Sequence, residues 1–456
     1  MTTRIIVFFV IFYASFYHRL KAAEHIIGSA DELSSLSLKP GKRVDLSYGN
    51  WHDQKHIFRA QGTEKAPVHL RARDAGKVIL KGNSSLLIDG SWLIVEGLKF
   101  EEGYTPASQH AVVFSERSTD CRLTNTAIID YNHPETNKIF NFWILVYGIR
   151  NRIDHCFIKG KTTRGTAIGV NISDKPNHHR IDHNYFGHRP DVKANGGEII
   201  RIGTDVWSMH DSYTTVEDNV FEHCDGEIEI ISNKSGHNTI RNNLFYESKG
   251  TLTLRHGNNA EVYGNFFIGN GVEETGGIRI IGENHQIYDN YFLGLRGTGL
   301  KAVFALTNAW QDPPLHGYWQ VKNVRITQNT IVDCKEVFVI GAGKDAKTFV
   351  PPVSTVITNN LLVGNSTLIN SIEKNAGISF LANTADHTTP TVLPAGIESK
   401  KVEMSRSGEG LLIPTNVPLQ KSQKIAALLN AADIGINWMD VKIKFEIKTV
   451  YKSESK

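Results

Sequence analysis

A short pattern that recurs through the middle of the chain limits its fold more strongly than any other feature. It places an asparagine between two apolar positions, as in Ile181-Asp-His-Asn184-Tyr-Phe186. The asparagines of the pattern are Asn184, Asn219, Asn243, Asn265, Asn290, Asn329 and Asn360, and successive copies lie 22 to 39 residues apart. A constant minimum length with variable insertions is typical of a solenoid, because each coil has a fixed girth and loops extend at its corners.

The residues around each asparagine indicate what a coil is made of. They are mostly apolar and β-branched, which favours short strands, and an asparagine suits the left-handed bend between two strands. A WD-type propeller has repeats of about 40 to 45 residues and other signature residues, so it fits less well. The sequence therefore predicts an all-β fold, a single-stranded right-handed parallel β-helix, in which the asparagine amides bond from coil to coil.

Both ends of the solenoid depart from the repeat. Ser29-Ala-Asp-Glu32 has the pattern of a helix start, and we expect a short helix to cap the N-terminal end. From about Ile397 the repeat fades, and a short helix is expected over Ile425–Asn430. We therefore expect the β-helix domain to span residues 24–400 and a C-terminal cap and tail to span residues 401–456.

The first residues of the chain predict export. Arg4 precedes an apolar run over Ile5–Phe16, and the small residues Ala22 and Ala23 follow. The run is shorter than the roughly 20 residues that a membrane-spanning helix needs. We therefore expect residues 1–23 to be a signal peptide and the mature protein to be secreted or periplasmic, with no membrane attachment after cleavage.

The charge of the chain argues against two classes of function. The formal net charge is +3, and the three basic residues of the first 23 positions, which contain no acid, account for all of it. A neutral mature chain is not typical of a general nucleic-acid or membrane-surface binder, whose surface is basic. The four cysteines, Cys121, Cys156, Cys224 and Cys334, have no zinc-binding spacing and are expected to be buried free thiols.

Four segments of the repeat align as consecutive rungs with charge on one face. They are Gly197–Gly203, Gly226–Ser232, Gly250–His256 and Gly276–Gly282. Because side chains alternate between the two faces of a strand, the alignment puts Arg201 among apolar residues on the core face. The other face carries Glu198, Glu227, Glu229, Thr251, Thr253, Arg255 and Arg279. Salt bridges on an ordinary surface are the alternative explanation, but the acids gather on one side and the bases on the other, which favours a functional site.

The acids of this face are suited to binding a cation. Glu227 and Glu229 direct two carboxylates to one side, which suits a hard cation with oxygen ligands. Asn195 lies about one coil earlier, and its amide oxygen could complete the site. Lys234 follows in the next turn, and Arg255 lies almost one coil further on. We therefore expect a cation, a lysine and an arginine in one site.

This combination suits β-elimination on a uronic acid better than glycoside hydrolysis, which needs a protonated carboxylic acid and an opposing carboxylate. In β-elimination a base removes the proton at C5, next to the substrate carboxylate, and the sugar linked at C4 leaves. A metal on that carboxylate would stabilise the developing enolate. Lys234 must be neutral to act as the base, and a neighbouring cation and Arg255 favour that form. Arg255 would stabilise the charge at the glycosidic oxygen.

The same segments carry a resemblance to polysaccharide lyase family 6, the alginate lyases and chondroitinase B. The matching strings are NGGEIIRIG (Asn195–Gly203), GEIEIISNKSGHN (Gly226–Asn238), LTLRHGN (Leu252–Asn258) and GGIRIIG (Gly276–Gly282). The resemblance runs from about residue 30 to about residue 400. It implies that Asn195, Glu227 and Glu229 bind Ca²⁺.

The resemblance also implies roles for the basic residues. Lys234 corresponds to the catalytic base of the family and Arg255 to the catalytic acid. Arg279 corresponds to an arginine that contacts the substrate. Arg201 and His256 lie inside the matching strings and are further candidate substrate-binding residues.

The expected substrate is an anionic polysaccharide, with alginate as the first choice. Dermatan sulfate is the alternative within the same reaction, and it would require cationic groups for sulfate, for which Arg296, Lys301 and Lys322 are the candidates. A non-catalytic carbohydrate-binding β-helix is the alternative outside this class. The loop over Trp310–Trp319 is expected to form a wall of the site. Mannuronate or guluronate preference, endo or exo action and the oligomeric state stay open from the sequence.

Overall fold

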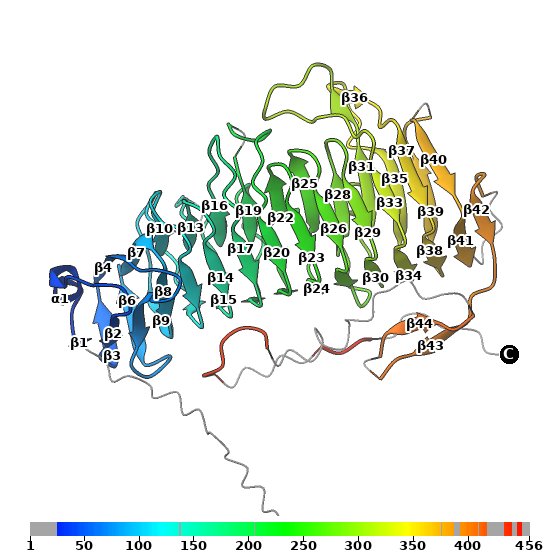
Figure 1. Cartoon of the computed structure of the whole chain (residues 1–456). Helices are drawn as coiled ribbons and strands as arrows, with labels where there is room; N and C mark the ends of the chain where they lie inside the picture. The colour runs from blue at the N-terminus through cyan, green and yellow to red at the C-terminus, as the bar shows by residue number, and fades with distance from the viewer. Residues whose placement is uncertain are drawn as a thin grey trace, which may run out of the picture.

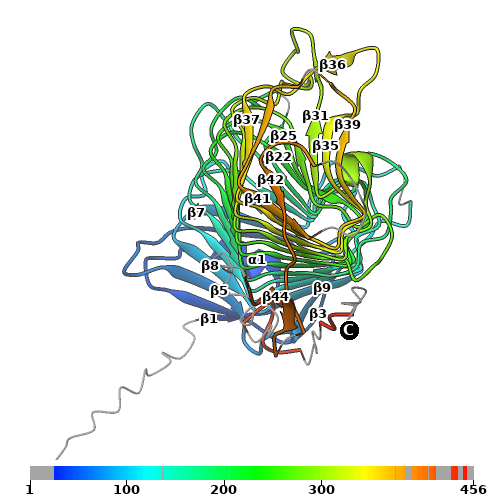
Figure 2. The ribbon, with the colours of Figure 1, turned by 90° about the vertical axis from the view of Figure 1, so that its right-hand side faces the viewer.

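The protein is described by a computed structural model over residues 25–135, 138–204, 206–374, 376–386, 393–408, 410–416, 433–439 and 445–448. The predicted signal peptide and the predicted helix over 425–430 lie outside these residues. Within the described residues the chain winds as a parallel β-helix, as the repeat predicts, and its coils follow one another along the molecule (Figure 1). Seen from its end, the solenoid encloses a core between the walls formed by its sheets (Figure 2).

Each coil gives one strand to each of three long parallel sheets, here called sheets 1, 2 and 3. Sheet 1 contains β1 (His25–Ile27), β2 (Arg43–Leu46), β5 (Val68–Ala72), β8 (Leu93–Glu96), β11 (Arg122–Thr124), β14 (Arg152–Asp154), β17 (Arg180–Asp182), β20 (Thr215–Glu217), β23 (Thr239–Arg241), β26 (Glu261–Tyr263), β29 (Gln286–Tyr288), β33 (Arg325–Thr327), β37 (Thr355–Thr358) and β40 (Ile378–Leu381). Sheet 2 contains β3 (Gly49–His52), β6 (Val78–Gly82), β9 (Leu98–Gly103), β12 (Ala127–Ile129), β15 (Phe157–Lys159), β18 (Tyr185–Phe186), β21 (Val220–Glu222), β24 (Leu244–Tyr246), β27 (Phe266–Ile268), β30 (Tyr291–Leu293), β34 (Thr330–Val332), β38 (Leu361–Val363), β41 (Asn383–Asp386) and β42 (Ile397–Ser399).

Sheet 3 completes the coils and carries the charged rungs. It contains β4 (Lys55–Gln61), β7 (Ser85–Ser91), β10 (Val112–Phe114), β13 (Ile144–Val146), β16 (Ile168–Val170), β19 (Ile200–Ile202), β22 (Glu229–Lys234), β25 (Thr251–His256), β28 (Ile278–Ile280), β31 (Phe304–Thr307), β35 (Glu336–Ala342) and β39 (Thr367–Ser371). Two antiparallel pairs stand outside the coils, β32 (Ala309–Trp310) with β36 (Thr348–Val350) and β43 (Met404–Arg406) with β44 (Leu412–Pro414).

The core of the solenoid is a stack of like side chains from successive coils. Phe186, Phe221, Phe245, Phe267 and Phe292 lie one above another, with ring centroids 4.9, 4.8, 4.5 and 4.7 Å apart. Each occupies the apolar position two residues after a pattern asparagine, so the repeat in the sequence becomes a column in space. Stacked rings at this spacing bury a large apolar area in each coil.

The asparagines form the predicted ladder. Its members are Asn184, Asn219, Asn243, Asn265, Asn290, Asn329, Asn360 and Asn383. Asn243 is typical, because its Nδ2 donates to Asn265 Oδ1 at 3.0 Å and to Val216 O at 2.9 Å, while its Oδ1 accepts from the backbone N–H of Asn219 at 3.1 Å. Each buried amide thus joins three consecutive coils.

The placement of the left-handed bend was predicted wrongly by one residue. The positive φ lies at the residue before each asparagine, for example at Asp218 (φ 53°) and Asn242 (φ 54°). The asparagine that follows has no positive φ, and its side chain points inward along the ladder while its Nδ2 also donates to the carbonyl two residues earlier, as Asn243 does to Arg241 O at 3.0 Å.

Replacing Asn243 with alanine should lower the free energy of unfolding by about 2 to 4 kcal/mol, because the backbone N–H of Asn219 and several buried carbonyls lose their partners. Urea denaturation of the variant beside the wild-type protein measures this. Asn50→Ala, on an exposed position of β3, is the matched control and should change the midpoint little. Equal midpoints for the two variants would contradict a stabilising ladder.

The predicted cap helix and the predicted thiols are both present. α1 (Ala30–Ser35) begins after Ser29, whose Oγ accepts from the backbone N–H of Glu32 at 3.2 Å, and it buries Ala30 and Leu33 against the first coils. The four cysteines are buried and free. A short 3₁₀ helix, η1 (Gly299–Lys301), precedes β31. Over the described residues, no helix is both long and apolar enough to span a membrane.

The end of the chain returns to cover the outer face of sheet 2. Residues 433–439 and 445–448, here called the C-terminal strap, run below the coils together with β43 and β44 (Figure 1). Phe445 packs on Tyr246 with ring centroids 4.9 Å apart, and Trp438 Nε1 donates to Asn125 O at 3.0 Å. The outward side chains of this sheet are apolar, so the strap forms a second, smaller core outside the solenoid.

Candidate functional site

The charged rungs lie side by side on the outer face of sheet 3. The parallel register pairs Arg201 of β19 with Ser232 of β22, Ser232 with Thr253 of β25, and Thr253 with Arg279 of β28. Because paired residues in a parallel sheet point to the same side, these four side chains form one row. The buried isoleucines on either side of Arg201 and Arg279 belong to the core.

This register corrects the predicted position of Arg201, which lies on the outer face rather than the core face. The sequence alignment counted residues from the glycine of each rung, but the rungs do not keep that spacing. A bulge between Glu229 and Ile231 inserts one residue, so that Ile231, not Ile230, pairs with Leu252. The two glutamates that precede the bulge converge with Glu198 of the preceding loop. On the outer face, Arg201 packs over the ring of Phe142 at 4.9 Å.

Three carboxylates meet at the start of this row. Glu198, Glu227 and Glu229 each offer an oxygen, and these oxygens lie within 4.8 Å of one another. Glu229 is fixed further by Ser232, whose Oγ donates to Oε2, and by Arg279, whose Nη1 donates to Oε1 at 3.3 Å. Two of the three were predicted as ligands. Glu198 was placed on the same face but not among the ligands.

Asn195, the third predicted ligand, is exposed on the loop that leads into β19. Its backbone oxygen accepts from Arg164 Nε at 3.1 Å. The same loop delivers Glu198 three residues later, past Gly196, which has a φ of +104°, and Gly197. Of the NGGE string, the structure brings the Glu198 carboxylate into the cluster, while the contact given for Asn195 is made by its backbone oxygen.

The carboxylate cluster has the features of a site for a divalent cation. Among the described residues, Glu198 Oε2 and Glu227 Oε1 are buried without a hydrogen-bond partner. Burial, together with the carboxylates of Glu198 and Glu229, raises the pKa of Glu227. Buried oxygens that repel one another and lack donors are relieved by a cation, and an all-oxygen set is what Ca²⁺ prefers.

Lys234 and Arg255 lie beside the cluster at the ends of β22 and β25. Lys234 pairs with His256 across the two strands, and Arg255 is the preceding residue. His256 is buried, and its burial, followed by the charges of Arg255 and Lys234, lowers its pKa to about 2. His256 is therefore neutral, and its Nδ1 lies 3.4 Å from Arg255 Nη1. The three predicted residues are thus brought into one group.

A loop closes over the basic side of the site, as predicted for Trp310–Trp319. Arg255 donates from Nη1 to Gly317 O at 3.0 Å and from Nη2 to His316 O at 3.2 Å. The ring of Tyr318 lies 4.3 Å from the Arg255 guanidinium, and its hydroxyl accepts from Arg279 Nη2 at 2.6 Å. Tyr318 thus holds both arginines in place, a role that no local pattern in the sequence signals.

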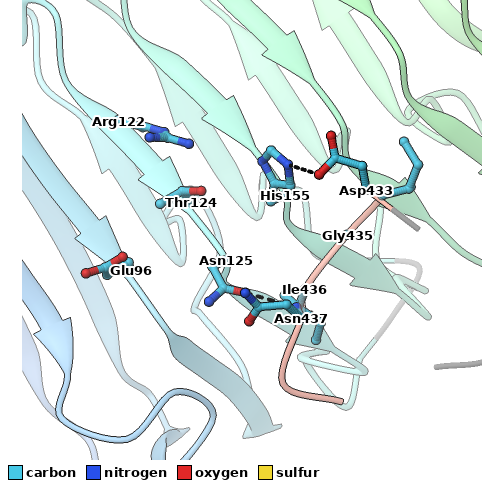
Figure 3. A pocket seen from close by; sticks show the side chains of 10 residues that line it. Glu96, Arg122, Thr124, Asn125, His155, Asp433, Gly435, Ile436 and Asn437 are labelled. Atoms are coloured by element: carbon cyan, nitrogen blue, oxygen red, sulfur yellow. Dashed lines mark hydrogen bonds and ion pairs between the residues drawn. The ribbon is translucent and has the colours of Figure 1, made fainter. Parts of the chain in front are cut away.

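A separate cavity of about 340 Å³ lies elsewhere, between sheet 1 and the C-terminal strap (Figure 3). Its walls include Arg122, Thr124 and His155 on one side and Asp433 on the other, and His155 Nε2 lies 3.3 Å from Asp433 Oδ1. Because the three carboxylates lie at sheet 3, this cavity is not part of their site.

The chain is similar to a family of known sequences and to several solved structures. The sequence model of the chondroitinase B family matches residues 28–428. A variant of AlyGC, an alginate lyase of polysaccharide lyase family 6, is 37% identical with a TM-score of 0.85; the alignment covers 91% of this chain and 58% of that chain. The present chain therefore spans little more than half the length of that protein. No curated protein matches the chain.

Two further solved structures are similar over most of their own length. A mannuronic acid-specific family 6 lyase from human gut microbiota is 30% identical with a TM-score of 0.79, and the alignment covers 91% of this chain and 97% of that one. A family 6 polysaccharide lyase from Pseudopedobacter saltans is 27% identical with a TM-score of 0.70, covering 83% and 93%.

Proposed function

This chain belongs to the chondroitinase B family, polysaccharide lyase family 6, and from that premise we propose that it cleaves a uronate-containing polysaccharide by calcium-assisted β-elimination. One observation carries the proposal: a cluster of three carboxylates lies on the same sheet face as Lys234, Arg255 and Arg279. The cluster suits a cation, and the basic residues suit a substrate whose sugars are acidic. The predicted signal peptide extends the proposal to a secreted or periplasmic enzyme.

Alginate is the proposed substrate. AlyGC is described as an alginate lyase and the gut relative as mannuronic acid-specific, which supports a polymer of unsulfated uronates. The contacts of the three cations considered for sulfate recognition also favour alginate over dermatan sulfate. Arg296, Lys301 and Lys322 each pair with an acid, Asp333 at 2.9 Å, Glu274 at 3.4 Å and Glu283 at 3.6 Å respectively. Arg279 also pairs with an acid, but its partner Glu229 belongs to the carboxylate cluster, whereas the partners of these three cations lie outside that cluster.

Each basic residue of the site has a separate role in the proposed reaction. Arg279, fixed by Glu229 and Tyr318, is placed to hold the substrate carboxylate, and Arg201 in the same row and the neutral His256 are placed to orient the sugar. Lys234 takes the C5 proton on its Nζ. As the C4=C5 double bond forms and the C4–O bond breaks, Arg255 stabilises the charge on the leaving oxygen and supplies its proton, directly or through a water that it orders. Calcium, bound by Glu198, Glu227 and Glu229 with Asn195 nearby, would neutralise the substrate carboxylate and stabilise the enolate.

Ultraviolet absorbance of the 4,5-unsaturated uronate product tests the function. Alginate and dermatan sulfate are compared, each with and without a chelator. A rise on alginate that the chelator abolishes supports the proposal, and a rise on dermatan sulfate alone moves the enzyme to the chondroitinase reaction with the same residues. No rise on either polymer, from folded protein with calcium present, would leave the non-catalytic carbohydrate-binding β-helix as the better description.

Tyr318→Phe should lower kcat/KM about tenfold, because Arg279 loses a charged hydrogen bond while the ring under Arg255 remains. Tyr318→Ala should lower it about 100-fold, because the stacking contact of Arg255 is lost as well. Steady-state kinetics on alginate measure both. Tyr213→Phe, at an exposed ring on another face, is the control, and wild-type kinetics for Tyr318→Ala would contradict the role of this loop.

A further inference from the structure

A buried arginine lies directly behind the carboxylate cluster. Arg189 is 1% exposed and sits at the start of the loop between β18 and β19 that carries Asn195 and Glu198. No acidic side chain forms a salt bridge with it among the described residues. Burying a guanidinium without such a partner is unfavourable unless its donors are satisfied and its charge is balanced nearby. Its Nη donors bond to backbone carbonyls, its Nε has no hydrogen-bond partner among the described residues, and the carboxylates that balance its charge are Glu198 and Glu227.

The donors of Arg189 tie two consecutive coils together at this corner. Nη1 donates to Glu198 O, and Nη2 donates to Gly196 O at 2.9 Å, so both ends of the ligand-bearing turn are fixed. Nη2 also donates to Thr163 O at 3.1 Å and to Gly165 O at 2.9 Å in the preceding coil. A planar fork with several donors in fixed directions makes this set possible, which a lysine would not reproduce.

The glycines around Arg189 show that this corner is closely packed. A Cβ on Gly226 would lie 3.0 Å from Arg189 Cδ and 2.2 Å from Gly197 O. The backbone of the next coil, which leads directly to Glu227, therefore rests against both the guanidinium stem and the ligand-bearing turn. Moving Arg189 would shift the backbone on which Glu198 and Glu227 are mounted.

The charge of Arg189 also fits the cluster. An arginine guanidinium is charged at neutral pH, and the carboxylates of Glu198 and Glu227 attract that charge. Three carboxylates facing one buried arginine leave a charge that a divalent cation would neutralise. The arginine thus keeps the carboxylates together before the cation arrives.

We propose that Arg189 is the positioning residue of the cation site, which fixes the loop of Asn195 and Glu198 through its carbonyls and supplies a permanent positive charge behind the carboxylates. This inference rests on the proposed calcium site. It assigns to Arg189 no contact with substrate and no part in the chemical step.

Calcium titration by calorimetry, on the full chain without substrate, tests the proposal. Arg189→Met keeps the length of the side chain but removes its donors and charge, and we expect it to raise the Kd for calcium about 10- to 100-fold. Arg189→Lys keeps the charge without the fork and should fall between Arg189→Met and the wild-type protein. If Arg189→Met does not fold, the lysine variant carries the test, with an expected Kd about tenfold above wild type.

Lys161→Met is the control for the preceding coil, because Lys161 is also 1% exposed and shares the acceptor Thr163 O with Arg189, at 3.1 Å, but bonds neither to a carboxylate nor to the turn of Gly196 and Glu198. Both methionine variants should lower stability in urea, but only Arg189→Met should weaken calcium binding. A wild-type Kd in a folded Arg189 variant would overturn the positioning role alone. Absence of calcium binding by the wild-type protein would overturn the cation site itself, and with it this inference.

Discussion

Replacing Lys234 with alanine is expected to lower kcat on alginate about 1000-fold, because the variant lacks the proposed base for the C5 proton. General bases contribute about 100- to 10,000-fold to the rates of such reactions. The change should leave the fold intact, since the Lys234 side chain lies at the end of β22, outside the core, and it should leave calcium binding intact because Lys234 is not a ligand. Product absorbance gives kcat, and calorimetry gives the calcium Kd.

The control for Lys234 is Lys65→Ala. Lys65 is exposed in the turn between β4 and β5 in an early coil of the solenoid, so its loss should change kcat less than twofold. Near-normal turnover by Lys234→Ala would remove Lys234 from the chemistry and favour the carbohydrate-binding description. Loss of calcium affinity in the same variant would instead point to a damaged site.

Removing the cation should reduce activity on alginate by about 100- to 1000-fold, the size of effect expected when a charge that stabilises the transition state is lost. A chelator tests this reversibly, and added calcium should restore the rate. Glu227→Gln tests the role of the cation by mutation, because the amide keeps the shape of the side chain but removes one negative charge from the cluster. Calcium should also raise the melting temperature of the wild-type protein, because it binds the folded form.

Glu261→Gln is the matched control for Glu227→Gln, because Glu261 is an exposed acid on sheet 1 and belongs to no cluster. It should keep both the rate and the calcium-dependent rise in melting temperature. Undiminished turnover in excess chelator, with calcium shown to be gone, would contradict a calcium-assisted mechanism while leaving the lyase activity standing.

The repeating features of the fold, its coils and its asparagine ladder, could be predicted from the sequence. Each asparagine of the pattern bonds to the next one along the solenoid, so a local motif specified a long-range contact once the coil was recognised. Asn383 escaped recognition because the apolar position after it holds the small Ala385, yet it accepts from Asn360 Nδ2 at 2.9 Å. Periodicity therefore identified the ladder and missed its last member.

The site was predicted in its composition but not in its geometry. The extra residue at Ile230 shifts the register, and a count from the glycines could not detect it, because a bulge leaves no sign in residue type. Glu198 was consequently placed on the right face without being seen to converge on Glu227 and Glu229. Tyr318 lies 63 residues from Arg255 in the sequence, and no repeat links the two, so their contact needed the folded loop.

The C-terminal strap has a consequence for how the protein is made. Residues 433–439 and 445–448 leave the ribosome after every strand of the solenoid, so a nascent chain can complete its coils while the outer face of sheet 2 is still bare. Tyr246 and Tyr291, which later bond to Glu446 O and Leu412 O, would then face water among apolar neighbours. Incomplete chains that expose such a surface tend to associate. Synthesis of β44 and the C-terminal strap therefore also covers an apolar surface through which incomplete chains would associate.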